Sequence, residues 1–374
     1  MMAVAVLASC QGPTDPQFDP AFALLTTINS DGLLTVVNLR SGAVVEQPTS
    51  DVGVFGEDAR AHASSVPTLY YAGAGKLVSF DLIRRAPTWT ELLGGSQQAR
   101  WGEQSIYANF SLALTPDETK LLAADSYYQG ILGVAVLNLN SRTATGFVSG
   151  LRARKMFTIH PGALLPDGGV LALGTTLPKT FGDDTERRRG KLYLLSGNPL
   201  TIQDSIKFLS ASDSAAGGVA EMIVDRAGKY AYFTTYNGKL HKFDLTSRAY
   251  AGSLTIRVYG PLALSPDGAW VYVIDGTHTR DYPGSGFMYM ADAGFAEARA
   301  IDLNSAARDG LPPQLNSIAV SSDGSHVYIG AGTAPRGPLF GVQRGSVIVV
   351  DTQSRVVEQR FSLPTWGVSS ILLL

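Results

Sequence analysis

The chain has 374 residues, of which 45% are hydrophobic and 17% are charged. This composition supports a large buried core and excludes an intrinsically disordered chain. A formal net charge of −2 gives no electrostatic basis for nucleic-acid binding. Forty glycines and nineteen prolines predict many turns and therefore many short strands. Downstream of the N-terminus no run of eighteen apolar residues could form a membrane-spanning helix.

The N-terminus is an apolar stretch that ends in Leu7-Ala8-Ser9-Cys10, and Cys10 is the only cysteine. No intramolecular disulfide can therefore form. The four residues resemble the lipobox of bacterial lipoproteins, in which the cysteine thiol is diacylated. The stretch lacks the basic residues of a complete signal, which leaves two interpretations: a true start upstream of Met1, or a chance match. We expect residues 1–10 to be a truncated lipoprotein signal with Cys10 as the lipidation site.

Residues 11–20 follow as a polar linker rich in Gly, Pro, Asp and Gln. Gln11 is not the aspartate that retains lipoproteins in the inner membrane of many Gram-negative bacteria. The resemblance therefore implies a lipid anchor in the outer membrane, on its periplasmic or surface face. The remaining chain, residues 21–374, is expected to be a single domain.

A turn signature containing aspartate, usually with proline or glycine, recurs between pairs of apolar runs. Proline presets φ at the first central turn position, aspartate accepts hydrogen bonds from nearby backbone, and glycine adopts positive φ. Each copy therefore predicts a β-hairpin. The copies are Leu114–Asp117, Leu165–Gly168, Ser265–Gly268 and Ser321–Gly324, with a weaker one at Asp225–Gly228.

A second signature follows each hairpin: an apolar alternating strand that ends in a polar turn. Its seven anchors are Asn38, Asp81, Asn138, Ser196, Asp244, Asp302 and Asp351. Their spacing of 43 to 58 residues is close to the period of a four-stranded propeller blade. The sequence predicts an all-β, seven-bladed β-propeller with four antiparallel strands per blade. A pair of β-sandwiches or an open solenoid is the alternative.

The two ends of the domain are complementary. The C-terminal segment 366–374 has the pattern of a first strand, and segment 21–28 has the pattern of a second strand that lacks its first. We expect the C-terminal strand to complete the N-terminal blade and close the ring, which removes free strand edges.

Three stretches resemble the YVTN-type β-propellers of bacteria and archaea, which have the lactonase-like propellers as cousins. They are Gly228–Asn237, Ser265–Asp275 and Ser321–Gly330. The resemblance covers roughly residues 20–374 and is weak in the first two blades, where the Pro-Asp-Gly turn is missing. It implies the propeller fold, and a fold does not by itself imply a function.

Most of the extra chain length is predicted in loops between the second and third strands of a blade, the B–C loops. These are 126–132, 176–190, 276–297 and 333–345, whereas the turns between first and second strands are expected to be tight. All B–C loops leave a blade on the same face of the ring. Because binding residues concentrate on loops of a rigid scaffold, we expect this face to bind a partner.

The loop at 276–297 is rich in aromatic residues, methionine and arginine, which are enriched at interface cores. Its predicted partner-binding residues are Arg280, Tyr282, Phe287, Met288, Tyr289 and Met290. The alternative is that this loop folds back and packs its own aromatic side chains over the ring. The mixed-charge segment 183–189 is expected to be a solvated loop tip, with an arginine-bound anionic ligand as its alternative.

The sequence contains no recognisable catalytic or metal-binding constellation. The five histidines lack paired metal-ligand spacing, and His160, expected near the start of an inner strand, fits a structural role. The four tryptophans have no regular register for a quinone cofactor. Five carboxylates on or near connections to inner strands could bind calcium or act as a general base in the channel, although exposed loop carboxylates are common; they are Glu57, Asp58, Glu103, Asp213 and Glu221.

We therefore predict a lipid-anchored binding or scaffolding propeller, with no catalytic residue, metal or cofactor assigned. Its partner would be a protein or an envelope polymer, engaged through the B–C-loop face, and its membrane contact only the lipid. The alternative is a lactonase-like hydrolase with a site, possibly metal-dependent, in the central channel. An enzyme should bring three or more carboxylate, histidine or asparagine side chains together in that channel.

Overall fold

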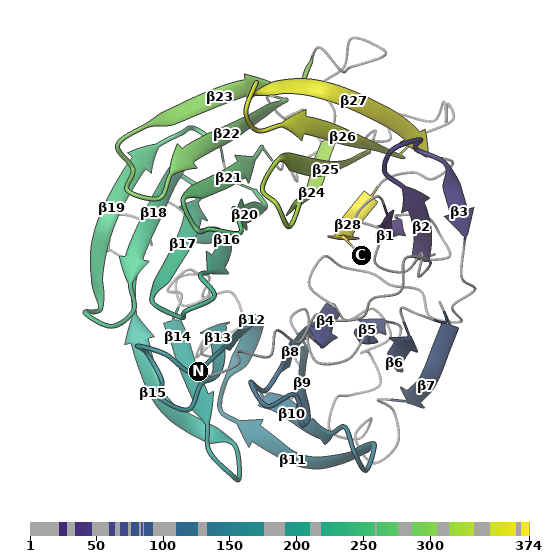
Figure 1. Cartoon of the computed structure of the whole chain (residues 1–374). Coiled ribbons are helices and arrows are strands. Elements are labelled where there is room, and N and C mark those ends of the chain that lie inside the picture. The colour runs from purple at the N-terminus through teal and green to yellow at the C-terminus, as the bar shows by residue number, and fades with distance from the viewer. Residues whose placement is uncertain are drawn as a thin grey trace, which may run out of the picture.

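A computed structural model describes sixteen stretches of the chain, and within them every element is a β-strand. These strands form seven sheets, each of four antiparallel strands, which are arranged as blades around a ring (Figure 1). The prediction of a seven-bladed propeller is confirmed. The described residues are 22–27, 34–46, 60–63, 68–73, 76–81, 84, 86–92, 110–125, 133–175, 191–209, 218–258, 260–275, 286–304, 314–332, 345–363 and 368–373.

The first four blades are listed here from their inner to their outer strand. Blade 1 contains β28 (Val368–Leu373), β1 (Phe22–Thr27), β2 (Leu34–Asn38) and β3 (Val44–Glu46). Blade 2 contains β4 (Arg60–Ala63), β5 (Thr68–Gly73), β6 (Lys76–Asp81) and β7 (Ala86–Leu92). Blade 3 contains β8 (Phe110–Leu114), β9 (Lys120–Asp125), β10 (Gly133–Asn138) and β11 (Thr143–Ser149). Blade 4 contains β12 (Arg152–Ile159), β13 (Gly169–Thr175), β14 (Lys191–Ser196) and β15 (Thr201–Lys207).

The last three blades follow the same plan. Blade 5 contains β16 (Val219–Val224), β17 (Tyr230–Thr235), β18 (Lys239–Asp244) and β19 (Ala249–Thr255). Blade 6 contains β20 (Leu262–Leu264), β21 (Trp270–Ile274), β22 (Phe287–Asp292) and β23 (Ala298–Asp302). Blade 7 contains β24 (Gln314–Val320), β25 (His326–Gly332), β26 (Gly345–Asp351) and β27 (Val356–Leu363).

The C-terminal strand completes the N-terminal blade, as the sequence predicted. Strand β28 pairs antiparallel with β1, in a register that runs from Ala23 opposite Leu373 to Thr27 opposite Val368. The first and last parts of the chain are therefore held together by backbone hydrogen bonds. The inner edge of β1 is paired and cannot add a foreign strand.

The core lies in layers between neighbouring blades. Third strands such as β10 and β26 are buried along almost their whole length, whereas outer strands such as β11 and β19 are mostly exposed. One layer joins Leu122 and Val136 of blade 3 to Met156 and Val170 of blade 4. Each blade thus buries both faces of its middle strands against its two neighbours, which explains their continuous apolar runs.

In blade 6 the sequence prediction of the anchor residue was wrong. The third strand of this blade is β22, which ends at Asp292, whereas the predicted anchor Asp302 ends the outer strand β23. The predicted B–C loop 276–297 is therefore too long, because residues 287–292 belong to a strand. Both segments end in an apolar residue and an aspartate, and only burial on both faces distinguishes the third strand.

Candidate functional site

One rim of the ring, which we call the turn rim, carries the A–B turns between first and second strands and the C–D turns between third and fourth strands. In the A–B turn of blade 6, Ser265 Oγ donates to Asp267 Oδ1 at 2.5 Å, and the backbone N–H of Ala269 donates to the same oxygen at 3.0 Å. Ser265 Oγ also accepts from the backbone N–H of Trp270 at 2.9 Å. Gly268 closes the turn with φ of 70°. The aspartate that accepts hydrogen bonds and the glycine with positive φ, both predicted for this turn, are thus present.

Equivalent turns repeat this network in other blades. In blade 7, Ser321 Oγ donates to Asp323 Oδ1 at 2.6 Å, and the backbone N–H and hydroxyl of Ser325 donate to it at 3.0 and 2.8 Å. These three donors stabilise the carboxylate and lower the pKa of Asp323 to about 2. Blade 4 departs from the expected tightness, because its A–B connection extends over residues 160–168.

The C–D turns share a second network. The carboxylate of Asp244 accepts from the backbone N–H groups of Thr246 and Ser247, both at 2.8 Å. Bonds to the residues two or three positions later recur in six blades, at Asn38, Asp81, Asn138, Asp244, Asp292 and Asp351. Five of the seven sequence anchors therefore begin such a turn, and a sixth, Ser196, also ends a third strand. In blade 6 the third strand ends at Asp292 instead of the predicted Asp302.

The opposite rim, which we call the loop rim, receives every B–C and D–A connection, because consecutive strands in a blade are antiparallel. Four B–C connections here are long: 126–132, 176–190, 275–286 and 333–344. The internal residues of these connections lie almost entirely outside the described residues. The strand bounds therefore show that the long B–C connections all lie on this rim.

The predicted partner-binding residues divide into two groups. Met288 and Met290 lie on β22 with 0% and 4% exposure, and Phe287 and Tyr289 on the same strand are half-buried. The two methionines are core residues and not part of an exposed loop, because the neighbouring blades cover both faces of a third strand. Arg280 and Tyr282 lie outside the described residues, so their role stays a prediction, as does lipidation of Cys10, which also lies outside them.

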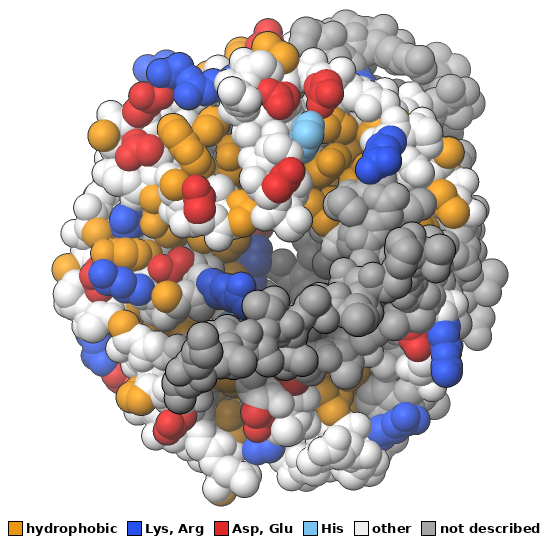
Figure 2. Space-filling view, viewed as in Figure 1, with side chains coloured by type: hydrophobic (Ala, Val, Ile, Leu, Met, Phe, Trp, Pro, Cys, Tyr) orange, Lys and Arg blue, Asp and Glu red, His pale blue; other side chains and the backbone are white. Residues whose placement is uncertain are grey.

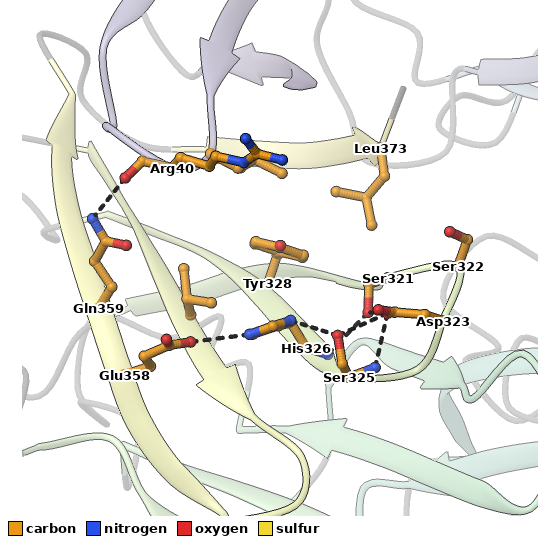
Figure 3. A pocket seen from close by; sticks show the side chains of 12 residues that line it. Arg40, Ser321, Ser322, Asp323, Ser325, His326, Tyr328, Glu358, Gln359 and Leu373 are labelled. Carbon is orange, nitrogen blue, oxygen red and sulfur yellow. Dashed lines mark hydrogen bonds and ion pairs between the residues drawn. The ribbon is translucent and has the colours of Figure 1, made fainter. Parts of the chain in front are cut away.

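A pocket of about 520 Å³ opens at the seam between blade 7 and blade 1. Figure 3 shows Arg40 and Leu373 of blade 1 on one wall, with His326 and Glu358 of blade 7 on the facing wall. Tyr328, on β25, lies between the walls and is 9% exposed. The amide of Gln359 crosses the seam and donates to the backbone carbonyl of Arg40 at 3.5 Å.

His326 is the centre of the hydrogen-bond chain in this seam pocket. Its Nε2 lies 3.0 Å from Glu358 Oε2, and its Nδ1 lies 2.6 Å from Ser325 Oγ. Ser325 Oγ in turn lies 2.8 Å from Asp323. The two ring nitrogens of His326 thus connect Glu358 of the outer strand to the A–B turn that holds Asp323.

Two carboxylates of the seam pocket lie close enough to Tyr328 to affect its phenol. Burial, and then the carboxylates of Asp323 and Glu358, raise the pKa of the Tyr328 phenol. Two carboxylates beside an aromatic floor can accept hydrogen bonds from an amine or a guanidinium group. Ser325 belongs to the repeated turn network and also bonds Asp323, so this group is not an activated nucleophile.

An ion pair joins the inner strands of blades 4 and 5. Lys155 Nζ on β12 lies 2.8 Å from Glu221 Oε2 on β16, and the Glu221 side chain is 11% exposed. His160 directly follows the end of β12, rather than lying near the start of an inner strand as predicted, and lines a pocket of about 300 Å³ between β8, β12 and β16. Glu221 is thus the one predicted channel carboxylate that the structure describes, and it is paired.

No group of three metal-ligating side chains occurs within the described ranges. Glu57, Asp58, Glu103 and Asp213 lie outside those ranges, as does the mixed-charge segment 183–189. No helix in the described part of the chain has the length and apolarity to cross a bilayer. The face shown in Figure 2 carries acidic, basic and hydrophobic side chains interspersed, without a field of one sign.

The seam pocket was missed because it is assembled from two ends of the chain. Arg40 and Gln359 are 319 positions apart, and no short motif joins them. One local feature of the sequence distinguished blade 7. Its second strand begins with a histidine, whereas the second strands of blades 3, 5 and 6 begin with lysine, tyrosine and tryptophan.

No family model matches the chain, and no curated protein matches its sequence. A solved structure that is similar is the β-propeller domain of Cps50 (Swd1) from Myceliophteria thermophila. It is 14% identical, with a TM-score of 0.53, over 83% of this chain and 87% of that chain. At this identity the likeness concerns the fold alone, and it agrees with the sheet topology: the chain is a β-propeller.

Proposed function

We propose that the chain is a lipid-anchored β-propeller of the YVTN type that binds or scaffolds a protein or envelope polymer through its loop rim. The observation that carries this proposal is the contrast between the rims. Turns of a few hydrogen-bonded residues close most of the turn rim, with the connection 160–168 of blade 4 as the exception, whereas connections such as 176–190 and 333–344 enter the loop rim. Long connections on one face of a rigid ring supply a surface that can vary without disturbing the blades.

The anchor is proposed at Cys10, in the Leu7-Ala8-Ser9-Cys10 lipobox, with the protein held at the bacterial outer membrane. Diacylation supplies two chains, which is the number that stable membrane attachment requires. The test is metabolic labelling with an alkyne fatty acid, followed by membrane fractionation of the wild type and of Cys10→Ala. We expect label and membrane association only in the wild type. Unlabelled wild-type protein in the soluble fraction would contradict the anchor.

The binding face is tested by photo-crosslinking in cells. A photo-reactive amino acid replaces Tyr282 in the loop rim or, as the matched control, Ser322 in the turn rim. We expect discrete adducts from position 282 and none of comparable yield from position 322. Equal adducts at both positions, or none at position 282, would refute partner binding through the loop rim.

The second candidate is a lactonase-like hydrolase with its site in the channel. The carboxylate that favours it is Glu221, which lies on the inner strand β16, is largely buried and is paired with Lys155. Its test is hydrolysis of a panel of lactones by purified protein, with and without a chelator. A hydrolase predicts turnover that falls at least tenfold in Glu221→Gln. The wild type with no turnover above buffer would remove this candidate.

A further inference from the structure

The position where β1 begins determines the rim from which the N-terminal segment leaves the ring. Phe22, the first residue of β1, pairs with Asn38, and Asn38 begins the C–D turn of blade 1 by accepting from the backbone N–H of Arg40 at 2.9 Å. Ala23 pairs with Leu373 at the other side of β1. The start of β1 and the end of β28 therefore both lie at the turn rim.

The seam pocket gives independent support for this placement. Leu373 lines it together with Arg40 and with Ser322 and Asp323, which belong to the A–B turn of blade 7. The last described residue of the chain is thus next to turns of two blades. In every other blade a covalent A–B turn occupies this place, whereas in blade 1 the two chain ends occupy it.

The segment between Cys10 and Phe22 limits how far the ring can move from a lipid on Cys10. Eleven residues, 11–21, can span at most about 40 Å. A six-residue strand separates the rims by about 20 Å. Because β1 starts at the turn rim, the loop rim lies about one strand length farther from the attachment point.

We infer that the turn rim faces the lipid surface and that the loop rim points away from it. This inference rests on the proposed anchor at Cys10. It adds to the proposed function that a partner reaches the loop rim from the side away from the membrane. Attraction by anionic lipid would not produce this orientation, because the turn rim carries both signs: Arg142 and Arg355 lie in its C–D turns, and Asp244 and Asp323 belong to other turns of the same rim. The short tether is what orients the ring.

The test uses full-length acylated protein reconstituted in vesicles of phosphatidylcholine and phosphatidylglycerol. Acylation blocks the only native thiol, Cys10, so Ser322→Cys at the turn rim and Ser149→Cys at the loop rim each carry one fluorophore. Both serines are exposed, which makes the pair matched. Energy transfer to an acceptor on the lipid headgroups is then measured.

We expect about twofold higher transfer from position 322 than from position 149, since the rims are about 20 Å apart. The difference should persist at high salt, because surface attraction is screened there and a covalent tether is not. Equal transfer, higher transfer from position 149, or loss of the difference in salt would overturn the inference. Combining each label site with Cys10→Ala separates the two claims. Vesicle binding without the acylated cysteine would refute the anchor and the orientation that rests on it, whereas equal transfer from the two sites in protein anchored through Cys10 would refute the orientation alone.

Discussion

The turn rim and the loop rim are built from the same strands but follow different rules. On the turn rim, Ser265–Asp267 and Ser321–Asp323 form the same bonds in different blades, and the third strands end in equivalent turns. On the loop rim, connections differ in length from blade to blade. The comparison teaches that stability is concentrated in the blades and the turn rim, which leaves the loop rim free to specialise.

The largest effect is expected for Gly42→Ala in the C–D turn of blade 1. Gly42 has φ of 70°, and an added Cβ would lie 2.5 Å from Cβ of Phe361 in blade 7. A left-handed backbone and a clash together cost about 3 kcal/mol of unfolding free energy. Gly268→Ala is the control, because it has the same φ and nothing within 4 Å, and it should cost about 1 kcal/mol. Urea denaturation that gives equal losses for the two variants would show that the contact across the seam is unimportant.

A smaller loss is expected for Asp323→Asn, about 1 kcal/mol at neutral pH, since the amide replaces a charged acceptor of three hydrogen bonds. The folded-state pKa of Asp323 is lowered to about 2. Its contribution is therefore present above the unfolded value near 4 and is lost as the pH falls through about 2. Urea denaturation of both proteins from pH 7 to pH 2 should show their difference shrinking in that window. Ser322→Ala, on the same turn, is the control and should match the wild type; a pH-independent difference would exclude the charge as its source.

A gain of about 0.5 kcal/mol is expected for Arg142→Gly. Arg142 adopts φ of 57° in the C–D turn of blade 3, a conformation that costs about 1–2 kcal/mol for a residue with Cβ. Greater freedom of glycine in the unfolded chain cancels part of that gain. Asn140→Gly, in the same turn without this strain, should lower the melting temperature. If both variants lower the melting temperature equally, the positive φ of Arg142 does not destabilise the folded protein.

The smallest effect on stability is expected from replacing residues 176–190 of the loop rim by a Gly-Ser segment of equal length. Changes away from the core and turns alter the unfolding free energy by roughly 0.5 kcal/mol. Photo-crosslinking from position 282 in this background then asks whether loops of different blades form one binding surface. Loss of adducts with unchanged stability would support a shared surface. A loss of several kcal/mol would instead make this connection part of the scaffold.

Much of the fold follows from local sequence. The turns that contain aspartate need only residues within five positions of one another, so the hairpins of blades 3 to 7 could be predicted. The complementary end segments also predicted the pairing of β1 with β28, because a blade of three strands leaves an unpaired edge. Blade 6 was the exception, since Asp292 and Asp302 both end apolar segments and their local patterns are alike.

What the sequence determined by itself was therefore the repeat: its turns, its number of blades and its closure, because these depend on bonds between near neighbours or on one missing strand. Only the tertiary structure decided that Met288 and Met290 are buried, that His326 meets Glu358, and that β1 starts at the turn rim. Each of these depends on what a neighbouring blade covers or on the direction of a paired strand. Burial and rim position are properties of the closed ring, and no short segment of the chain contains them.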